Sequence, residues 1–468
     1  MKSLDQIAAE LQGYDPNALR AEDVNAFLVK MVQPVQETER LAIFDALGRV
    51  LAHDLISTVN VPPHDNSAMD GFAFSGSQLG DAPLVLRVAG TALAGAAWRG
   101  NVGAGECLKV MTGAVLPQGL DTVVPQEFVK TSGTEGESFI TIAPGMLKTG
   151  DNRRLAGEDI QAGQAALKRG TRLSPAALGL VASLGVAELT VWRKLRVAYF
   201  STGDEILSLG EPAREGAVYD SNRYTVFGLL ARLGVQMIDM GVVRDEPAML
   251  EAAFTRAAAE ADAIITSGGV SVGEADHTKA MMKKLAGSAG GVAFWRVAMR
   301  PGRPMAVGRI ARNIPNVAAA GVVNPLDAAT VNLDAAAVAN AADAAVANLD
   351  DTAVLFGLPG NPVAVMVTFL AFVRPALLRM MGCLEAAPPL LRASSSEAIR
   401  KKPGRTEYQR GIVNRAADSS LQVRITGDQG SGVLSSMTQA NGLIVLHHEQ
   451  GNVAPGDSVE VMMFDGMI

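Results

Sequence analysis

The sequence predicts a multidomain protein of the α/β plus β class, with a doubly wound α/β domain at its centre. Its 468 residues, 48% of them hydrophobic, are enough to bury several separate cores. Between about residue 195 and residue 385, apolar runs of strand length alternate with longer amphipathic segments. Residues 388–468 instead show short strand signals separated by Gly and Asn turns, a pattern typical of a β-barrel-like domain.

The α/β domain is predicted to begin with the strand LRVAYF. The helix SNRYTVFGLLARLG follows, with Asp220 or Ser221 as its N-cap and Gly234 at its end. VQMIDMG is the next strand, AMLEAAFTRAAAEA the next helix and ADAIITS the third strand. Strands that alternate with helices in this way indicate a parallel, right-handed, doubly wound sheet.

Composition excludes several other classes. The formal net charge is −7 and the basic residues form no long run, which argues against nucleic-acid binding. The N-terminal segment MKSLDQIAAELQ becomes acidic before any apolar stretch, and the apolar run at 363–373 is too short to span a bilayer. The two cysteines, Cys107 and Cys383, have no CxxC spacing, so neither a disulfide framework nor a zinc site is indicated. We therefore expect a cytoplasmic enzyme or binding protein that contacts neither nucleic acid nor membrane.

Polar turns follow three of the predicted strands. STGDE follows the first strand at 201–205, SGGVSVGEAD follows the third at 267–276, and PGNP follows the apolar run AVLFGL at 359–362. Ligands of doubly wound sheets bind at the carboxyl ends of the strands, so these turns are expected to converge on one site. The glycines could be simple turn formers, or they could let backbone N–H groups approach an oxyanion.

Carboxylates gather on the same predicted edge, at Glu205, Asp220, Asp245, Glu274 and Asp276. Beside a phosphate-binding turn, such carboxylates usually imply a hard divalent cation, most simply Mg²⁺. The alternatives are ordinary ones: Asp276 could cap the following helix, and Glu205 could be a solvated loop charge.

Basic residues form a second candidate group. FWRVAMRPGRP contains Arg296, Arg300 and Arg303. If the segment is extended, Arg296 and Arg300 share a face, where guanidinium groups could bind a tetrahedral oxyanion. The alternative is a solvated basic edge.

Eight motifs together resemble the MoeA family of molybdopterin molybdenumtransferases, which is similar also to the C-terminal domain of gephyrin. In chain order they are DNSAMDGFA, MTGA, RRLAGEDI, STGDE, SGGVSVGEAD, FWRVAMRPGRP, GLPGNP and PGRTEYQRG. The resemblance covers nearly the whole chain. It implies insertion of molybdate into adenylated molybdopterin with release of AMP, assisted by Mg²⁺.

The resemblance also implies site residues. Catalytic positions would be Asp70, Thr112, Asp159, Glu205, Asp245 and Asp276, of which Glu205, Asp245 and Asp276 would hold Mg²⁺. Substrate-binding positions would be Ser267, Gly268, Gly269, Ser271, Gly273, Arg296, Arg300, Pro359, Gly360, Asn361, Pro362, Arg410 and Ser431. Many relatives have lysine where this chain has Arg296, Arg300 and Arg303, so charge is kept but donor geometry differs.

Motifs and family layout together suggest the domain boundaries. Residues 1–57 and 158–194 would form a discontinuous domain for dimerisation, and residues 58–157 a small β domain. Residues 195–387 would form the molybdopterin-binding α/β domain, and 388–468 the β-barrel-like domain. The implied partners are a second copy sharing the active-site cleft, a separate molybdopterin adenylyltransferase, and downstream proteins that mature molybdoenzymes.

An Ala-, Asn- and Asp-rich insertion at about 313–352 departs from the family. Its asparagines recur at 316, 324, 332, 340 and 348, a spacing that gives no constant helix face. We expect a flexible or weakly helical surface insertion, and a partner-binding arm is the alternative.

Two other functions stay open at this point. The α/β domain also resembles the adenylyltransferases that act on molybdopterin, although those single-domain proteins lack DNSAMDGFA, MTGA and PGRTEYQRG. A non-catalytic scaffold like the gephyrin domain is the other candidate.

Overall fold

The computed structural model describes residues 2–134, 137–270, 277–312, 351–384 and 389–467. The predicted insertion at about 313–352 lies almost entirely outside these residues. The chain folds as two compact units. Unit 1 comprises Met1–Glu39, Gly48–Ala52 and Val191–Ile468, and unit 2 comprises Arg40–Leu47 and His53–Thr190.

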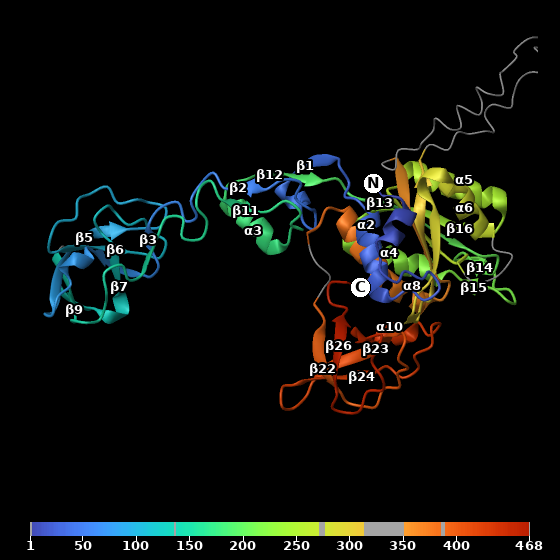
Figure 1. Cartoon of the computed structure of the whole chain (residues 1–468). Coiled ribbons are helices and arrows are strands. Elements are labelled where there is room, and N and C mark those ends of the chain that lie inside the picture. Colours follow the sequence, from blue (N-terminus) through green and yellow to red (C-terminus); the bar gives the residue numbers. More distant parts are fainter. Residues whose placement is uncertain (1, 135–136, 271–276, 313–350, 385–388, 468) are drawn as a thin grey trace, which may run out of the picture. The chain divides into compact units, whose positions relative to one another are not determined.

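Unit 1 contains the predicted α/β sheet (Figure 1). Four strands run parallel, namely β13 (Arg196–Thr202), β16 (Gln236–Val243), β17 (Ala263–Ser267) and β21 (Thr352–Leu358). The strand order is β16-β13-β17-β21-β20-β18. The predicted strands are confirmed, but β20 (Pro304–Ala311) and β18 (Val292–Arg296) pair antiparallel at one edge. Residues 297–303 are too short a connection for a helical crossover, so this pair forms antiparallel.

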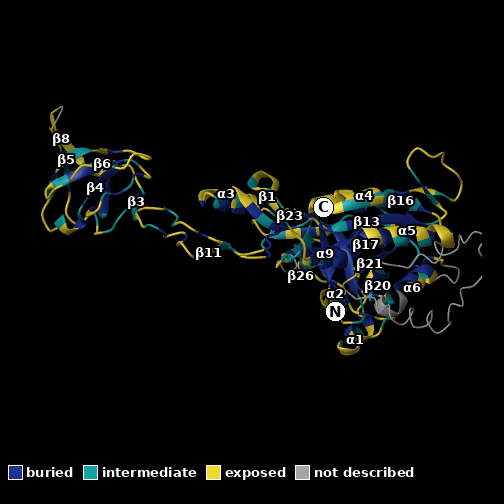
Figure 2. Ribbon diagram, turned by 90° about the horizontal axis from the view of Figure 1, so that it is seen from above, coloured by how far each residue is buried: buried dark blue, intermediate teal, exposed yellow. Residues whose placement is uncertain are grey.

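Helices cover both faces of the sheet. On one face lie α4 (Ser221–Leu233) and α8 (Pro362–Thr368), and on the other lie α5 (Pro247–Glu260) and α6 (His277–Gly290). Side chains alternate along each strand, so Val197 and Tyr199 pack with the first core while Ala198 and Phe200 pack with the second. Figure 2 shows the central strands buried between helices whose outer faces are exposed. This two-sided burial explains why the strands read as continuous apolar runs.

The predicted helix α4 has both expected caps. Asp220 is the N-cap, with Oδ1 accepting a hydrogen bond from the Arg223 N–H at 3.1 Å. Gly234 ends the helix in the left-handed conformation, with φ of +79°. A side chain at that φ would clash with the following carbonyl, which is why glycine stands there.

The apolar run at 363–373 belongs to a longer helix. It consists of α8, the π-helical turn η4 (Phe369–Val373) and α9 (Arg374–Met380). Pro362–Met380 has the length and hydropathy of a membrane-crossing helix, but 89% of its most apolar window is buried inside the protein. That burial is the pattern of a core helix in a globular domain.

The C-terminal strands form a closed ring, as predicted. β22 (Leu391–Ser395), β23 (Thr406–Arg415), β24 (Leu421–Ile425), β26 (Ser458–Met463) and β25 (Gly442–Leu446) pair in the order β23-β24-β22-β26-β25, and β25 pairs back to β23. Closure leaves no unpaired strand edge within the ring. The short strand β19 (Met299–Arg300) pairs with β23 and so joins the FWRVAMRPGRP segment to the barrel. The short helix α10 (Ser435–Gln439) packs on β23.

Unit 2 is built around a second sheet. Its order is β7-β4-β6-β5-β9-β8, from β4 (Gly71–Phe74), β5 (Leu84–Ala92), β6 (Glu106–Val110), β7 (Thr122–Pro125), β8 (Lys130–Thr134) and β9 (Glu137–Ile142). The predicted helix at 174–185 is α3 (Pro175–Ser183). Unit 2 also contains β2 (Leu55–Ile56), β3 (Asn66–Ser67), β10 (Arg153–Arg154) and β11 (Ala165–Leu167). The smaller elements of unit 1 are α1 (Leu4–Ala9), α2 (Ala21–Met31), β14 (Ile206–Leu207) and β15 (Val218–Tyr219). The strands β1 (Thr38–Ala42) and β12 (Glu188–Trp192) have residues in both units.

Candidate functional site

A cavity of about 870 Å³ lies at the carboxyl ends of the parallel strands in unit 1. The turns after β13, β17 and β21 all contribute to its wall, together with the barrel loop 429–432. The predicted site residues that line it are Glu205, Ser267, Gly268, Arg300, Pro359, Gly360, Asn361, Pro362 and Ser431. The structure thus brings the three polar turns together in one space, where a doubly wound sheet binds its ligand.

Other predicted site residues lie elsewhere. Gly269, Asp245, Arg296 and Arg410 are in unit 1 but outside the cavity lining. Ser271, Gly273 and Asp276 fall outside the described residues, as does Glu274. Asp70, Thr112 and Asp159 belong to unit 2.

The glycine turn after β17 needs its glycines for steric reasons. Gly268 has φ of +91°, and a Cβ there would lie 2.3 Å from the Thr202 carbonyl oxygen. Gly269 has φ of +65°, and its Cβ would lie 2.5 Å from the Thr278 Cβ. Gly268 therefore lets the chain turn tightly against the end of β13, and Gly269 lets it pass close to the start of α6. The turn places Gly268 in the cavity wall.

Three buried hydroxyl groups lie directly beneath this turn. The Tyr199 hydroxyl is 2.7 Å from Ser267 Oγ and 2.9 Å from Ser201 Oγ, and the two serine oxygens are 3.1 Å apart. Burial raises the pKa of Tyr199 above its ordinary range, so its hydroxyl keeps its proton. The ring of hydrogen bonds fixes the position of Ser267 at the cavity wall.

Of the predicted acidic residues Glu205 and Asp245, only Glu205 lines the cavity. Glu205 is exposed on the cavity wall. Asp245 is half-buried, and its Oδ1 accepts a hydrogen bond from the Thr278 hydroxyl at 3.0 Å. Thr278 Oγ1 lies 3.4 Å from Thr202 Oγ1, and Thr202 does line the cavity. Among the described residues, no group of three His, Cys, Asp or Glu side chains is placed to hold a metal ion.

The basic segment is not one extended strand. Arg296 ends β18, whereas Arg300 lies in β19, which belongs to the barrel sheet. Between them the Val297 N–H donates to the Arg303 carbonyl at 2.7 Å, so the chain folds back on itself. The predicted shared face of Arg296 and Arg300 is therefore wrong, because the two residues belong to different sheets. Of the two, only Arg300 lines the cavity.

Arg410 lies behind the barrel loop. Its guanidinium donates to Ser436 Oγ at 3.0 Å, to the Gly430 carbonyl at 2.9 Å and to the Asp428 carbonyl at 3.2 Å. Burial lowers the pKa of Arg410 to about 10, so it is still charged at neutral pH. Arg410 therefore shapes the loop that carries Ser431, whose Oγ accepts a hydrogen bond from Asn361 Nδ2 at 3.0 Å.

The first turn of α4 adds Asp220, which the sequence placed on the acidic edge but without a site role, and Asn222, which was not predicted. Asp220 and Asn222 both line the cavity and are 3% and 7% exposed. Asp220 Oδ2 and Asn222 Oδ1 are buried and receive no hydrogen bond from the described part of the chain. The sequence signal was the polar pair in YDSN, where the capping role accounts for only one of the two carboxylate oxygens of Asp220.

In unit 2, Asp70 and Thr112 form a tight pair. Asp70 Oδ1 accepts hydrogen bonds from the Thr112 N–H and from its hydroxyl, each at 2.7 Å. These bonds hold the pKa of the Asp70 carboxyl below its ordinary value, with the backbone N–H as the larger cause. Asp159 is exposed, and its N–H donates to the Val61 carbonyl at 3.0 Å.

Three known domain families match successive parts of the chain. The MoeA N-terminal region (domain I and II) matches residues 19–185, the probable molybdopterin binding domain matches 198–379, and the MoeA C-terminal region (domain IV) matches 392–464. These matches agree with the family predicted from the eight motifs.

Individual relatives match over nearly the full chain. The molybdopterin molybdenumtransferase of Haemophilus influenzae is 37% identical over 433 residues, which cover 92% of this chain and 95% of that protein. The one of a Nostoc species is 31% identical over 440 residues, 93% of this chain and 91% of that protein. Two solved structures of the molybdopterin biosynthesis MoeA protein of Pyrococcus horikoshii each cover 96% of this chain, and 100% and 99% of their own chains. Their TM-scores are 0.71 and 0.67, at 23% and 26% identity. The chain therefore belongs to the MoeA family of molybdopterin molybdenumtransferases.

Proposed function

We propose that this protein inserts molybdate into adenylated molybdopterin and releases AMP. The observation that carries this proposal is the single cavity of about 870 Å³ that joins the glycine turn at Gly268, the carboxylate of Glu205 and the guanidinium of Arg300. A cavity of this volume is of the size that proteins use for cofactor-sized ligands. The family relatives, which are named for this transfer, support the same activity.

The barrel side of the cavity suits an oxyanion. Arg300 is exposed there and supplies positive charge, and Ser431 adds a hydroxyl group. Guanidinium groups bind tetrahedral oxyanions through paired N–H donors, so molybdate or a substrate phosphate would bind on this side. Because the dithiolene sulfurs of the substrate bind molybdenum, the protein needs no cysteine ligand for the metal.

Mg²⁺ is the cation that we propose to assist the reaction. Mg²⁺ usually binds one or two carboxylates together with substrate phosphates and water, so the described residues need not supply three acids. The exposed carboxylate of Glu205 in the cavity wall fits this role. The family resemblance adds Asp245 and Asp276 as the candidates for a further carboxylate ligand. When bound, the ion would stabilise the charge that develops on the phosphate oxygens.

Hydrolysis of the adenylate breaks its phosphoanhydride bond, with water as the attacking group and AMP as the leaving group. The protein's own contribution is to hold the substrate. The glycine turn lets the backbone approach it closely, and Arg300 provides charge that pre-exists in the folded site. The hydroxyl ring under Ser267 keeps the turn in place.

The assembly and location that we propose follow the family. The protein would be a cytoplasmic homodimer in which the partner's Asp70, Thr112 and Asp159 complete each site. Adenylated substrate would come from a separate adenylyltransferase, and the product would pass to proteins that mature molybdoenzymes. Mixing an Asp70→Ala variant with a Glu205→Gln variant tests the shared site, because mixed dimers would regain one intact site and part of the activity.

An assay with purified components tests the activity itself. The protein is incubated with adenylated molybdopterin, molybdate and Mg²⁺, and both AMP and molybdenum cofactor are measured. Failure to form either product would defeat the proposal. Formation of adenylated molybdopterin from ATP and molybdopterin would indicate the adenylyltransferase alternative, and inactivity in both assays would favour the scaffold.

Two variants locate the activity in the cavity. Glu205→Gln removes the carboxylate in the wall and is expected to abolish AMP release. Asp204→Asn makes the same charge change at the exposed neighbour outside the lining, and it is expected to keep activity. Equal losses in both variants would place the chemistry elsewhere.

A further inference from the structure

The first turn of α4 holds two unpaired hydrogen-bond acceptors in residues that line the cavity. Asp220 and Asn222 are each more than nine-tenths buried, and both line the cavity. Asp220 Oδ1 is used as the helix cap, whereas Oδ2 receives no hydrogen bond from any described residue. Leaving a buried carboxylate oxygen unpaired costs free energy, so a ligand group that donates to it gains a large advantage.

The orientation of Asn222 is fixed by its second contact. Its Nδ2 donates to the Gly360 carbonyl oxygen at 2.7 Å. Because a carbonyl oxygen can only accept, the amide nitrogen must lie on that side and Oδ1 on the other. Oδ1 is buried and lacks a donor among the described residues, so it is a second acceptor on the same turn.

Ser267 adds a third acceptor to this wall. The ring formed by Tyr199, Ser201 and Ser267 has three hydroxyl groups and three hydrogen bonds between them. Each hydroxyl carries one proton, so the closed ring uses all three protons internally. What Ser267 can offer to a ligand is then a lone pair of its oxygen.

The wall therefore has two chemically distinct sides. The α/β side contains the buried, unpaired acceptors Asp220 Oδ2 and Asn222 Oδ1, and the barrel side contains the cation Arg300. A ligand that matches both sides has adjacent N–H donors at one end and an anionic group at the other. The pyrimidine edge of a pterin carries two such adjacent donors, its 2-amino group and N3–H.

We infer that Asp220 and Asn222 recognise the N–H edge of the pterin and thereby select a 2-aminopterin as substrate. This inference rests on the proposed function, because that function supplies the pterin. It assigns a specificity role to two residues of the α4 cap, and the anion at the other end of the substrate faces Arg300. Replacing the 2-amino group by an oxo group would bring an oxygen against Asp220 Oδ2, where two acceptors repel each other.

A binding assay separates this recognition from the reaction. The probes are neopterin monophosphate and the corresponding lumazine, which differs by having a 2-oxo group in place of the 2-amino group. Affinities are measured by the intrinsic fluorescence of the probes, with EDTA present and without molybdate. The wild-type protein is expected to bind the pterin probe about 10- to 100-fold more tightly than the lumazine probe.

Asp220→Asn is the informative variant. Asparagine is as good an N-cap as aspartate, so its Oδ1 can still accept from the Arg223 N–H and α4 is expected to fold. The amide nitrogen then replaces the free acceptor by a donor. We expect the pterin preference to disappear or reverse, through weaker pterin binding and stronger lumazine binding. Asn222→Ala is expected to weaken pterin binding without strengthening lumazine binding.

Asp239→Asn is the matched control. Asp239 makes its ion pair with Arg223 of α4 but does not line the cavity. The Asp239→Asn substitution removes the same charge close to the same helix. The preference of this variant for the pterin probe is therefore expected to equal that of the wild type.

Three results would overturn the inference. The first is a wild-type protein that binds both probes equally or neither of them, even if AMP release in the transferase assay is intact. The second is an equal fall in the affinity of the Asp220→Asn variant for both probes, which would indicate a structural role. The third is a fall in the pterin affinity of the Asp220→Asn variant that occurs only when Mg²⁺ replaces EDTA, which would make Asp220 a metal ligand. Failure of the transferase assay with an intact pterin preference would count against the proposed reaction and not against this recognition.

Discussion

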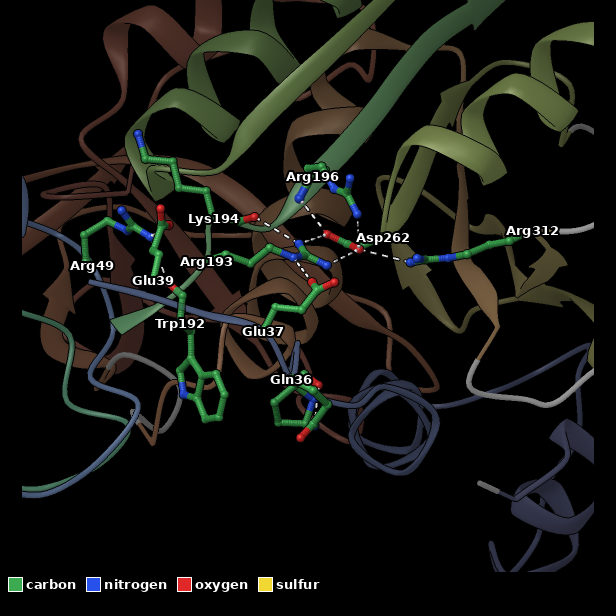
Figure 3. Close-up of polar contacts among 11 residues, drawn as sticks. Gln36, Glu37, Glu39, Arg49, Trp192, Arg193, Lys194, Arg196, Asp262 and Arg312 are labelled. Carbon is green, nitrogen blue, oxygen red and sulfur yellow. Dashed lines mark hydrogen bonds and ion pairs between the residues drawn. The ribbon is translucent and has the colours of Figure 1, made fainter. Parts of the chain in front are cut away.

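Arg193 and Asp262 form a bidentate ion pair in unit 1, with Nη1 2.6 Å from Oδ2 and Nη2 2.9 Å from Oδ1 (Figure 3). Arg312 donates to the same Oδ1 at 3.0 Å, and the Arg196 N–H donates to Oδ2 at 2.9 Å. Burial by itself raises the pKa of Asp262, but the hydrogen bonds from Arg193, from the Arg196 backbone and from Arg312 outweigh it and hold the pKa below its ordinary value. One carboxylate at the start of β17 therefore joins β13, β17 and the end of β20.

Asp262→Ala is expected to destabilise unit 1 strongly. The substitution removes a buried carboxylate that accepts charged hydrogen bonds from the half-buried side chains of Arg193 and Arg312, which costs about 1.5–3 kcal/mol. The measurement is the urea midpoint followed by tryptophan fluorescence, in a Trp98→Phe background so that Trp192 and Trp295 of unit 1 report. The control is Glu260→Gln, which breaks the exposed pair with Arg256 and should cost no more than about 0.5 kcal/mol. Similar midpoints for the two variants would show that the buried pair is not a major source of stability.

Gly268→Ala and Gly228→Ala are expected to have opposite effects. Gly268 has a positive φ and a Cβ would meet the Thr202 carbonyl, so alanine is expected to cost about 1–2 kcal/mol and to move the turn away from the ligand. Gly228 is exposed in the middle of α4 and a Cβ there meets nothing within 4 Å, so alanine is expected to add about 0.5–1 kcal/mol. Thermal melting and affinity for neopterin monophosphate are the measurements. Unchanged affinity in the Gly268→Ala variant would exclude a binding role for the turn.

Arg410→Lys is expected to weaken molybdate binding through the loop that carries Ser431. A lysine keeps the charge but cannot reproduce the fork that donates to Ser436, Asp428 and Gly430. Each of these partly buried hydrogen bonds contributes about 0.5–1.5 kcal/mol, so the loop is expected to loosen when they are lost. Calorimetric titration with molybdate measures the loss. Arg415→Lys changes an exposed arginine of the same strand and is expected to leave the titration unchanged; a fall in that variant as well would point to a general charge effect.

The pH dependence of unit 2 is expected to change in Thr112→Val. Valine removes the hydroxyl donor but keeps the N–H, so the pKa of Asp70 is expected to rise toward its ordinary value of 3.8 without reaching it. A lowered pKa in the folded state means that the pair stabilises unit 2 above the unfolded pKa, and that this stabilisation is lost as pH falls through the folded pKa. The variant is expected to lose it at a higher pH than the wild type. Carbon NMR of the Asp70 carboxyl group measures the titration. Thr131→Val, an exposed threonine in the same unit, is expected to leave it unmoved.

Much of the fold could be predicted because its signals are local. Strands β13, β17 and β21 are continuous apolar runs, and α4 carries its own cap at Asp220 and its own stop at Gly234. The three polar turns could be assigned to one site because the carboxyl ends of parallel strands share an edge. Family motifs then supplied the ligand class. The antiparallel edge strands escaped prediction because their pairing depends on the path of residues 297–303.

The roles of individual side chains depended on packing. The sequence determined that Asp220 caps a helix, but only the tertiary structure left its second oxygen buried in the cavity wall. The same holds for Tyr199, which reads as one more apolar strand residue yet reaches Ser267, 68 positions away, to close the hydroxyl ring. The family resemblance implies Arg410 as a substrate-binding residue, and the structure shows that it is 1% exposed and donates to backbone carbonyls. Periodicity and helix caps depend on residues that are close in the sequence, so they can be predicted from it. Burial and hydrogen-bond partners depend on which groups lose water when distant segments pack together, so only the tertiary structure decides them.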